Sequence, residues 1–323
     1  MGYPSYSVKM ASREVNGRLL GLVISTSHRN WAIGSLADTL RSQIPETGLI
    51  SMPQSRRDAR SLKGLVYLPK YRNYLFMHHA LAVEAWGKGW INERSNFGVR
   101  FTHEGIDITN ESEVFRAAKF VTVERSESRY GLIDLGVEPG KISMLPHPID
   151  VGLFQGVSQN VDRDIIFVSN YADRKNPDLI LETIKQNPDL SFTIFGKNWE
   201  IWYRYPELIS LQNLVYLPFE YKTYSHVLAR HKVFCSLSYI EGGPVPLLES
   251  LVTGLKVVVT DTGYVRDVLQ MATDYNILPI NPNIVEIRMS LQSALSDLQV
   301  TNSDYREYSI ENYVSKIRNM FGL

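Results

Sequence analysis

Cysteine is almost missing from this chain, since Cys235 is the only one among 323 residues. No disulfide can form within the chain, and a metal site built on several cysteines is excluded. Cys235 lies in the apolar run Val233–Leu237, a setting typical of a buried strand residue.

Long apolar runs are also missing. No stretch approaches the roughly 18–20 residues that a membrane-spanning helix requires. Near the start, Leu19–Ile24 is too short for the apolar region of a signal peptide and has polar neighbours. Tyr6 stands where N-myristoylation needs Ser or Thr. We therefore expect a soluble, cytoplasmic protein.

An overall excess of one charge is absent, because 34 Lys and Arg balance 34 Asp and Glu. This balance argues against nucleic-acid binding by the whole surface. Residues 1–148 nevertheless hold 19 Lys and Arg against 14 Asp and Glu, and the remainder holds 15 against 20. Much of the excess lies in the basic segment Arg56–Arg72. This segment is a candidate contact for an anionic membrane or an anionic acceptor, with nucleic acid as the less favoured partner.

Apolar residues are plentiful, at 44% of the chain, which suffices for two domain cores. Short β-branched runs alternate with helical patterns, which indicates parallel sheets covered on both faces. The expected strands are residues 18–25, 48–52, 74–77, 98–102, 120–123 and 141–145, then 164–168, 191–195, 214–217, 233–237 and 256–260. Pro146-His147-Pro148 and a polar run after it mark a boundary. The sequence predicts an α/β protein with domains 1–148 and 149–308, and a final amphipathic helix, 309–323, that packs back on the first domain.

Two glutamates, Glu241 and Glu249, flank a Gly-Gly-Pro turn and the start of an apolar helical run. Glycines let the backbone approach a ligand closely, and the run predicts a helix that ends near Gly254. A helix N-terminus after such a turn offers free N–H groups and a positive dipole end to a phosphate. On these features alone, a Gly-capped turn with two solvated carboxylates is an equal alternative.

This stretch, Glu241-Gly-Gly-Pro-x-Pro-Leu-Leu-Glu249-Ser, closely resembles the E-x7-E donor motif of retaining glycosyltransferases of family 4. Three other segments resemble the same family: residues 118–126, 141–150 and 167–177. The resemblance implies the GT-B fold, in which two Rossmann-like domains with parallel sheets face an interdomain cleft. The N-terminal domain then serves the acceptor and the C-terminal domain binds the nucleotide-sugar donor.

The resemblance also implies roles in the donor domain. Lys175 would stabilise the leaving diphosphate, Glu241 would lie beside the donor sugar, and Glu249 would accept hydrogen bonds from the ribose hydroxyls. Stabilisation of developing charge typically contributes ~3–4 kcal/mol per contact. The other donor-binding candidates are Arg174, Asn170, Gly196, Lys197, Gly242, Gly243, Pro244 and Val245. A solvated lysine and two surface carboxylates are the structural alternative.

In the first domain, His103 matches a family histidine that points toward the donor sugar, and it is the third catalytic candidate beside Lys175 and Glu241. Gly34, His78 and His79 are the acceptor-side candidates, with helix-start and packing roles as their alternatives. The His-His pair lacks a third ligand at metal spacing. Since the family generally needs no metal, we expect no metal and no cofactor, with the nucleotide-diphosphate sugar as donor substrate.

Three positions depart from the family pattern. Asn170 replaces an arginine, which leaves Arg174 as its candidate substitute; His147-Pro148 replace Asn-Gly, and Lys256 replaces a proline. We predict a metal-independent, retaining glycosyltransferase that acts on a glycan, lipid-linked or small-molecule acceptor by a front-face mechanism. One alternative is transfer to a modified nucleic-acid base. Another, suggested by Asn170, is a non-catalytic protein of the same fold that binds nucleotide sugars or glycans.

Overall fold

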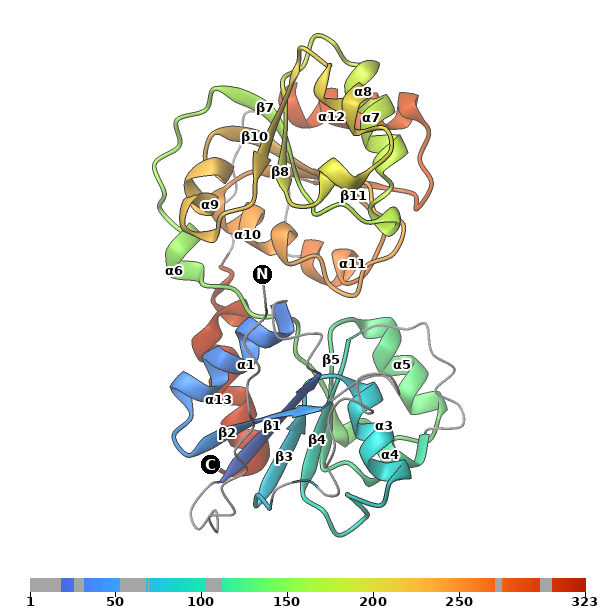
Figure 1. The fold of residues 1–323 in the computed structure, drawn as a ribbon, viewed down its shortest axis with the longest axis vertical. Helices are drawn as coiled ribbons and strands as arrows, with labels where there is room; N and C mark the ends of the chain where they lie inside the picture. The colour runs from blue at the N-terminus through green and yellow to red at the C-terminus, as the bar shows by residue number, and fades with distance from the viewer. Residues whose placement is uncertain are drawn as a thin grey trace, which may run out of the picture. The chain divides into compact units, whose positions relative to one another are not determined.

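The structure is a computed structural model of the chain that describes residues 19–25, 32–52, 68, 70–102, 112–270, 275–296 and 304–323. This part contains two six-stranded sheets with helices packed against them (Figure 1). The strands for which pairing is resolved run parallel to their neighbours. The α/β class expected from the sequence is confirmed.

The first sheet has the strand order β2-β1-β3-β4-β5-β6. Its inner strand β1 is buried along its whole length, as a parallel strand covered on both faces should be. The strands are β1 (Leu20–Ser25), β2 (Thr47–Met52), β3 (Asn73–Phe76), β4 (Phe97–Phe101), β5 (Phe120–Val123) and β6 (Ile142–Met144). The helices between them are α1 (Ala32–Gln43), α3 (His79–Gly87), α4 (Ser112–Ala117) and α5 (Ser126–Asp134).

The second sheet has the order β12-β11-β10-β7-β8-β9, so the chain reverses its direction of winding between β7 and β10. Its strands are β7 (Arg163–Val168), β8 (Phe192–Gly196), β9 (Leu214–Pro218), β10 (His231–Ser236), β11 (Lys256–Thr260) and β12 (Tyr275–Leu278). Its helices are α6 (Val151–Phe154), α7 (Pro177–Lys185), α8 (Tyr205–Ile209), α9 (Tyr221–Leu228), α10 (Val245–Thr253), α11 (Val265–Leu269) and α12 (Ile284–Ser296). In an open parallel sheet, the carboxyl edge at such a reversal is where ligands bind.

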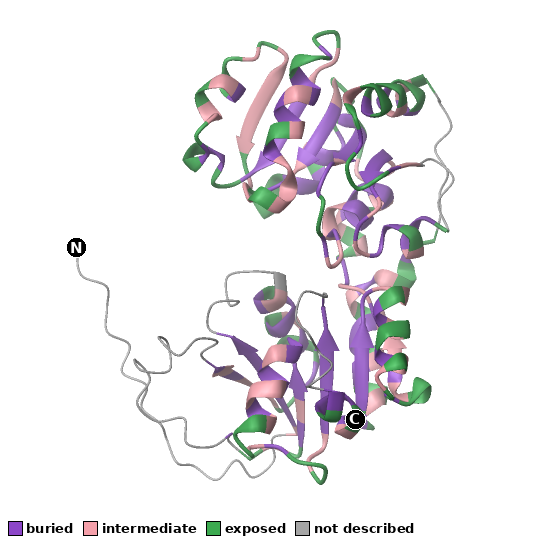
Figure 2. Cartoon of the chain, turned by 90° about the vertical axis from the view of Figure 1, so that its right-hand side faces the viewer, coloured by how far each residue is buried: buried purple, intermediate pink, exposed green. Residues whose placement is uncertain are grey.

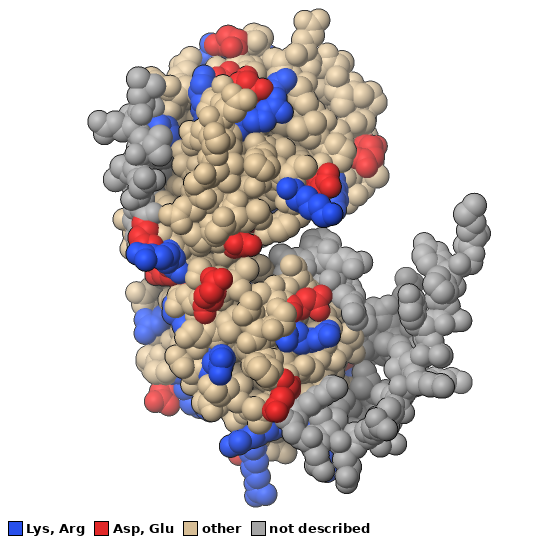
Figure 3. All heavy atoms as spheres, turned by 90° about the vertical axis from the view of Figure 1, so that its left-hand side faces the viewer, with Lys and Arg blue, Asp and Glu red and all other residues tan. Residues whose placement is uncertain are grey.

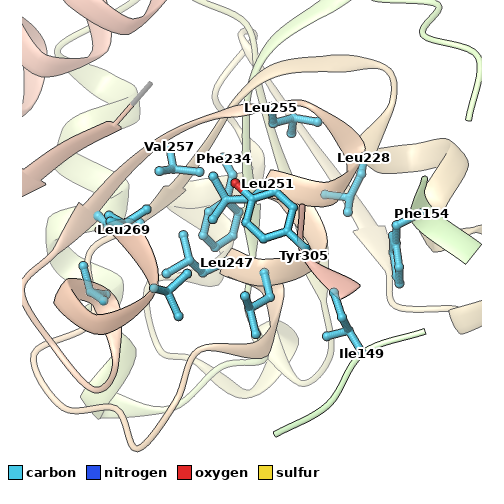
Figure 4. Close-up of a cluster of buried hydrophobic side chains, with 14 of the residues drawn as sticks. Ile149, Phe154, Leu228, Phe234, Leu247, Leu251, Leu255, Val257, Leu269 and Tyr305 are labelled. Atoms are coloured by element: carbon cyan, nitrogen blue, oxygen red, sulfur yellow. The ribbon is translucent and has the colours of Figure 1, made fainter. Parts of the chain in front are cut away.

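Two apolar clusters fill the layers beside the second sheet, and its strands are mostly buried (Figure 2). In one cluster, Leu247 and Leu251 of α10 pack with Val257 of β11 and Phe234 of β10 (Figure 4). In the other, the buried side chains of α7 pack with those of β8 and α12. The packing of α10 on the sheet fixes where its N-terminus lies.

The segment after the first sheet pairs with the end of the chain. The Ile149 N–H donates to Tyr308 O at 2.9 Å, and Ile310 N–H donates to Ile149 O at 3.2 Å. Helix α13 (Ile310–Phe321) follows, and the ring of Phe321 lies 4.8 Å from that of Phe120 in β5. The final helix therefore contacts the first sheet. The boundary at residues 148/149 falls between β6 and α6 and stays a prediction.

The expected strands are all present, with ends within two residues of those expected. Five short elements were not expected: β12, α4, α6, α8 and α11. Among the helices of the described residues, none combines the length and the apolar character that a membrane span needs.

Candidate functional site

The donor-domain candidates gather at the carboxyl edge of the second sheet, where β7 and β10 end. Ser169-Asn170 follow β7, and Leu237–Glu241 follow β10. These two strands are hydrogen-bonded neighbours at the reversal of the strand order. The sequence thus delivers two loops to the edge at which parallel α/β sheets bind ligands.

Two cations meet one carboxylate at this edge. Arg174 Nη1 donates to Glu241 Oε2 at 2.7 Å, and Lys175 Nζ donates to Glu241 Oε1. The side chains of Glu241 and Lys175 are 7% and 18% exposed, whereas that of Arg174 is 42% exposed. The group therefore carries a net positive charge, with the arginine facing solvent.

Backbone contacts tie the two loops together. Tyr239 N–H donates to Arg174 O at 3.1 Å, and Arg174 Nη1 also reaches Ile240 O at 3.3 Å. A left-handed Asn176, with φ of 56°, ends the turn that carries both cations and lets α7 begin at Pro177. The positions of the cations are thus set by the backbone and by the start of α7.

Burial raises the pKa of Glu241, but Lys175 and Arg174 more than offset it, so that the pKa lies below its ordinary value. A hydrogen bond from the Ser238 side chain adds to this lowering. Burial lowers the pKa of Lys175, and the Glu241 carboxylate opposes part of the shift. Each charge of the pair thus stabilises the other in a site largely shielded from water.

The glycine turn leads directly into α10. A Cβ atom on Gly243 would lie 2.2 Å from Cε1 of Tyr264, so a larger residue does not fit. Pro244 occupies the cap position of α10 and offers no side-chain acceptor to the first N–H groups. Gly254, with φ of 88°, ends the helix as expected. In the first turn of α10, Pro246 has no N–H and the Leu247 N–H donates to Pro244 O at 2.9 Å, so the Val245 N–H is the donor that an anion could use.

Glu249 lies inside the fold, where its carboxylate Oε2 accepts a hydrogen bond from the Tyr224 hydroxyl at 2.8 Å. The residue is 6% exposed. Burial raises the pKa of Glu249 to about 7, and the Tyr224 hydrogen bond works against that rise. The structure therefore gives Glu249 a buried setting rather than the solvated helix surface of the structural alternative.

Asn170 organises the loop after β8. Its Oδ1 accepts from the Lys197 N–H at 2.8 Å, and Tyr171 N–H donates to Lys197 O at 2.8 Å. Arginine has no acceptor atom in its side chain, so it could not make the first of these bonds. A Cβ atom on Gly196 would lie 1.8 Å from Ser169 O, so this strand end requires glycine.

The first-domain candidates have packing contacts. Gly34 is a buried residue in the first turn of α1. His78 caps α3, with Nδ1 accepting from Ala80 N–H at 3.2 Å, and its ring stacks on that of His79 at a centroid distance of 4.5 Å. Both histidines are buried, at 4% and 0% exposed. Their acceptor-side role stays a prediction.

Other candidates lie outside the described residues. These are His103 and most of the basic segment, including Arg56, Arg57, Arg60 and Lys63. The last two basic residues of that segment, Lys70 and Arg72, are described and are exposed. Within the described ranges, His, Cys, Asp and Glu form no group of three that could hold a metal ion. The expected independence from metals stays a prediction.

Sequence reasoning missed Tyr224. It lies 25 residues before Glu249, and an aromatic residue on one face of a helix is ordinarily read as core. Only the packing of α9 beside α10 brings the hydroxyl to the carboxylate.

Comparisons with known proteins concern the family and the fold of the chain. Residues 153–312 match the family model described as glycosyl transferases group 1. One of the subunits of phosphatidylinositol N-acetylglucosaminyltransferase from Arabidopsis thaliana is 25% identical over 196 residues, 57% of this chain and 43% of that protein. The chain thus spans less than half the length of this curated relative.

Solved structures resemble the whole described fold. HepE from Anabaena, in complex with UDP-glucose, gives a TM-score of 0.71 at 11% identity, over 94% of this chain and 99% of that one. Sucrose-phosphate synthase from Thermosynechococcus elongatus gives 0.66 at 12% identity, over 94% and 95%. At such identities the likeness shows the fold alone. With the family match, it establishes that the chain has the GT-B fold and belongs to the glycosyl transferases group 1, a family of glycosyltransferase enzymes.

Proposed function

We propose that this protein transfers a sugar, with retention of configuration, from a nucleotide-diphosphate sugar to an acceptor hydroxyl. The observation that carries the proposal is the convergence of Lys175 and Arg174 on Glu241 at the carboxyl edge of β7 and β10. When the donor breaks, negative charge grows on the departing diphosphate. The shielded Lys175, with the more exposed Arg174 beside it, supplies the positive charge that this step requires.

Each part of the site has a task in this reaction. Lys175 stabilises charge on the leaving phosphate, and the Val245 N–H at the N-terminus of α10 is directed to the same anion. Arg174 supplies a second cation, in a chain that has Asn170 where the resemblance implies an arginine. Glu241 holds both cations when no donor is bound and faces the donor sugar when one is. Glu249 accepts hydrogen bonds from the ribose.

The leaving phosphate would accept the acceptor's proton on the same face, because Glu241 is paired with Lys175 and Arg174 and Glu249 is assigned to the ribose, so neither carboxylate serves as a nucleophile. We propose that the reaction needs no metal. A uridine nucleotide is the first donor to test, since the HepE complex contains UDP-glucose. A glycolipid acceptor is the first acceptor to test, because the Arabidopsis relative is named for transfer to phosphatidylinositol. A cytoplasmic location, with peripheral membrane contact through Arg56–Arg72, belongs to the same proposal.

Transfer to nucleic acid is the weaker alternative. On the face shown in Figure 3, the basic side chains of the described residues lie among acidic ones rather than in one broad patch. Binding to a phosphate backbone needs a positive field over an extended surface.

A donor panel tests the proposal. Purified protein is incubated with UDP-, GDP- and ADP-sugars, and release of the nucleoside diphosphate and retention at the anomeric carbon are measured. Lys175→Ala should lower kcat by about 100-fold or more, the usual effect of removing one donor to a developing oxyanion. Lys232→Ala is the matched control, because Lys232 is exposed and pairs with Asp164 away from this edge. Donor binding without turnover would instead support the non-catalytic alternative, and inversion would exclude a retaining mechanism.

A further inference from the structure

Tyr224 and Glu249 form a buried pair between neighbouring helices. The Tyr224 hydroxyl in α9 donates to Glu249 Oε2 in α10 at 2.8 Å. Tyr224 is 1% exposed and Glu249 is 6% exposed. Hydrogen bonds between a hydroxyl and a carboxylate are among the stronger ones, and exclusion of water strengthens them further.

An aromatic cage fixes the phenol ring. The centroids of Phe154, Phe195 and Phe219 lie 5.4, 5.6 and 5.2 Å from that of Tyr224. The first and third contacts are edge-to-face, a favourable geometry for aromatic pairs. The hydroxyl thus has a set direction, and it holds one oxygen of the carboxylate in place.

The surroundings of Glu249 otherwise favour its protonated form. Burial raises its pKa, and Tyr224 is the group that opposes this rise. Two further titratable side chains of the described residues interact with it, Tyr221 of α9 and Tyr264 just before α11. Burial raises the pKa of Tyr221 to about 12 and also raises that of Tyr264, so both are neutral near pH 7. Neither supplies positive charge to the carboxylate.

We propose that Tyr224 is a positioning residue for donor recognition, whose hydroxyl aims the Glu249 carboxylate at the ribose hydroxyls of a bound nucleoside diphosphate. The inference rests on the proposed function, in which Glu249 contacts the ribose. It adds a residue 25 positions away that acts only through that carboxylate. Removing the hydroxyl should affect ribose recognition and leave phosphate recognition intact.

Paired ligands separate the two effects. Binding of UDP and of 2′,3′-dideoxy-UDP is measured by titration calorimetry from pH 6 to pH 9, with GDP and ADP and their dideoxy forms beside them. Wild type should prefer the ribose form. Tyr224→Phe should reduce that preference ~tenfold near pH 7, the size of one hydrogen bond to a charged group. Affinity for the dideoxy form should stay unchanged, and the lost preference should return toward pH 9 as Glu249 ionises.

Three variants complete the test. Glu249→Gln should show little ribose preference at any pH, and adding Tyr224→Phe to it should change nothing more, because both act through one contact. Tyr216→Phe removes another tyrosine–glutamate bond of the same sheet, to Glu200 at 3.1 Å, and should keep the wild-type pH profile. Equal weakening of both ligands by Tyr224→Phe would overturn the inference and leave the proposed function standing. A wild type that binds none of these nucleotides would overturn both.

Discussion

At the scale of single residues, the candidate site is an arrangement of charges in which Lys175 and Glu241 are shielded from water and Arg174 faces solvent. Glu241 keeps Lys175 and Arg174 in place while the site is empty. In the proposed reaction, an incoming diphosphate would offer the same cations a second anion, so that they need little rearrangement. Asn170, which stands where the family pattern has an arginine, stabilises the loop after β8, because its side-chain oxygen accepts a hydrogen bond from the Lys197 N–H.

Glu249→Gln should stabilise the protein increasingly as the pH rises. The folded pKa of Glu249, about 7, lies above its ordinary value, so the folded state holds this proton more tightly than the unfolded state does. Wild type therefore loses stability as the pH rises through this window. Each pKa unit is worth about 1.4 kcal/mol, so the variant should gain on the order of 2–3 kcal/mol at pH 8 relative to pH 5.

Urea unfolding at both pH values measures this gain. The exposed Glu220, near the start of α9, provides the control, since Glu220→Gln should change stability equally at the two pH values. A gain for Glu249→Gln that does not depend on pH would show that Glu249 is not protonated inside the fold.

Motif spacing predicted part of this site. The glutamates and the lysine belong to local patterns, and the structure does bring Lys175 to Glu241. The pattern contained nothing about Tyr224, whose partner is 25 residues away. Which side chain faces a buried carboxylate depends on how two helices pack, and a single sequence does not carry that information.

At the scale of elements, strand ends and glycines determine the shape of the site. Gly196 ends β8 against the carbonyl of Ser169, and Trp199 Nε1 donates to that same carbonyl at 2.6 Å. The long strands and helices were predictable because their apolar periodicity extends over enough residues. The strand β12 carries Asn276 within its short apolar run, and α8 and α11 have five residues each, too few for a helical period to be distinguished.

Gly196→Ala should damage the carboxyl edge of β8 without unfolding the sheet. The new Cβ would lie 1.8 Å from a backbone oxygen, so the loop that starts with Lys197 must move. Core and backbone clashes of this kind typically cost about 1–3 kcal/mol. The free energy of nucleoside diphosphate binding should weaken by more than the free energy of unfolding falls. Both quantities are measured on the same preparation.

Gly156→Ala is the matched control, since a Cβ atom there meets nothing within 4 Å, although its φ of 75° makes it strained as well. If Gly156→Ala reduced nucleotide affinity as much as Gly196→Ala does, the effect would be general strain and not the position of the β8 loop.

At the scale of the whole molecule, the alternation of strands and helices predicted two parallel sheets, and both are present. The strand orders were not predictable, because the crossover rules allow several arrangements of six similar strands. The first sheet has β1 between β2 and β3, whereas the second has β7 between β8 and β10. These orders decide which loops become neighbours, and hence which residues can form a site.

The last helix provides the test at this scale. Phe321 of α13 is 5% exposed and packs edge-to-face on Phe120 of β5, at the opposite end of a long stretch of chain. Phe321→Ala should lower the free energy of unfolding by about 3 kcal/mol, because it removes a buried ring and leaves a cavity. Asn319, two residues earlier, is exposed and provides the control. Asn319→Ala should change the free energy of unfolding by less than about 0.5 kcal/mol. Urea unfolding followed by far-ultraviolet circular dichroism measures both, and equal stabilities of the two variants would mean that α13 does not pack on the first sheet in solution.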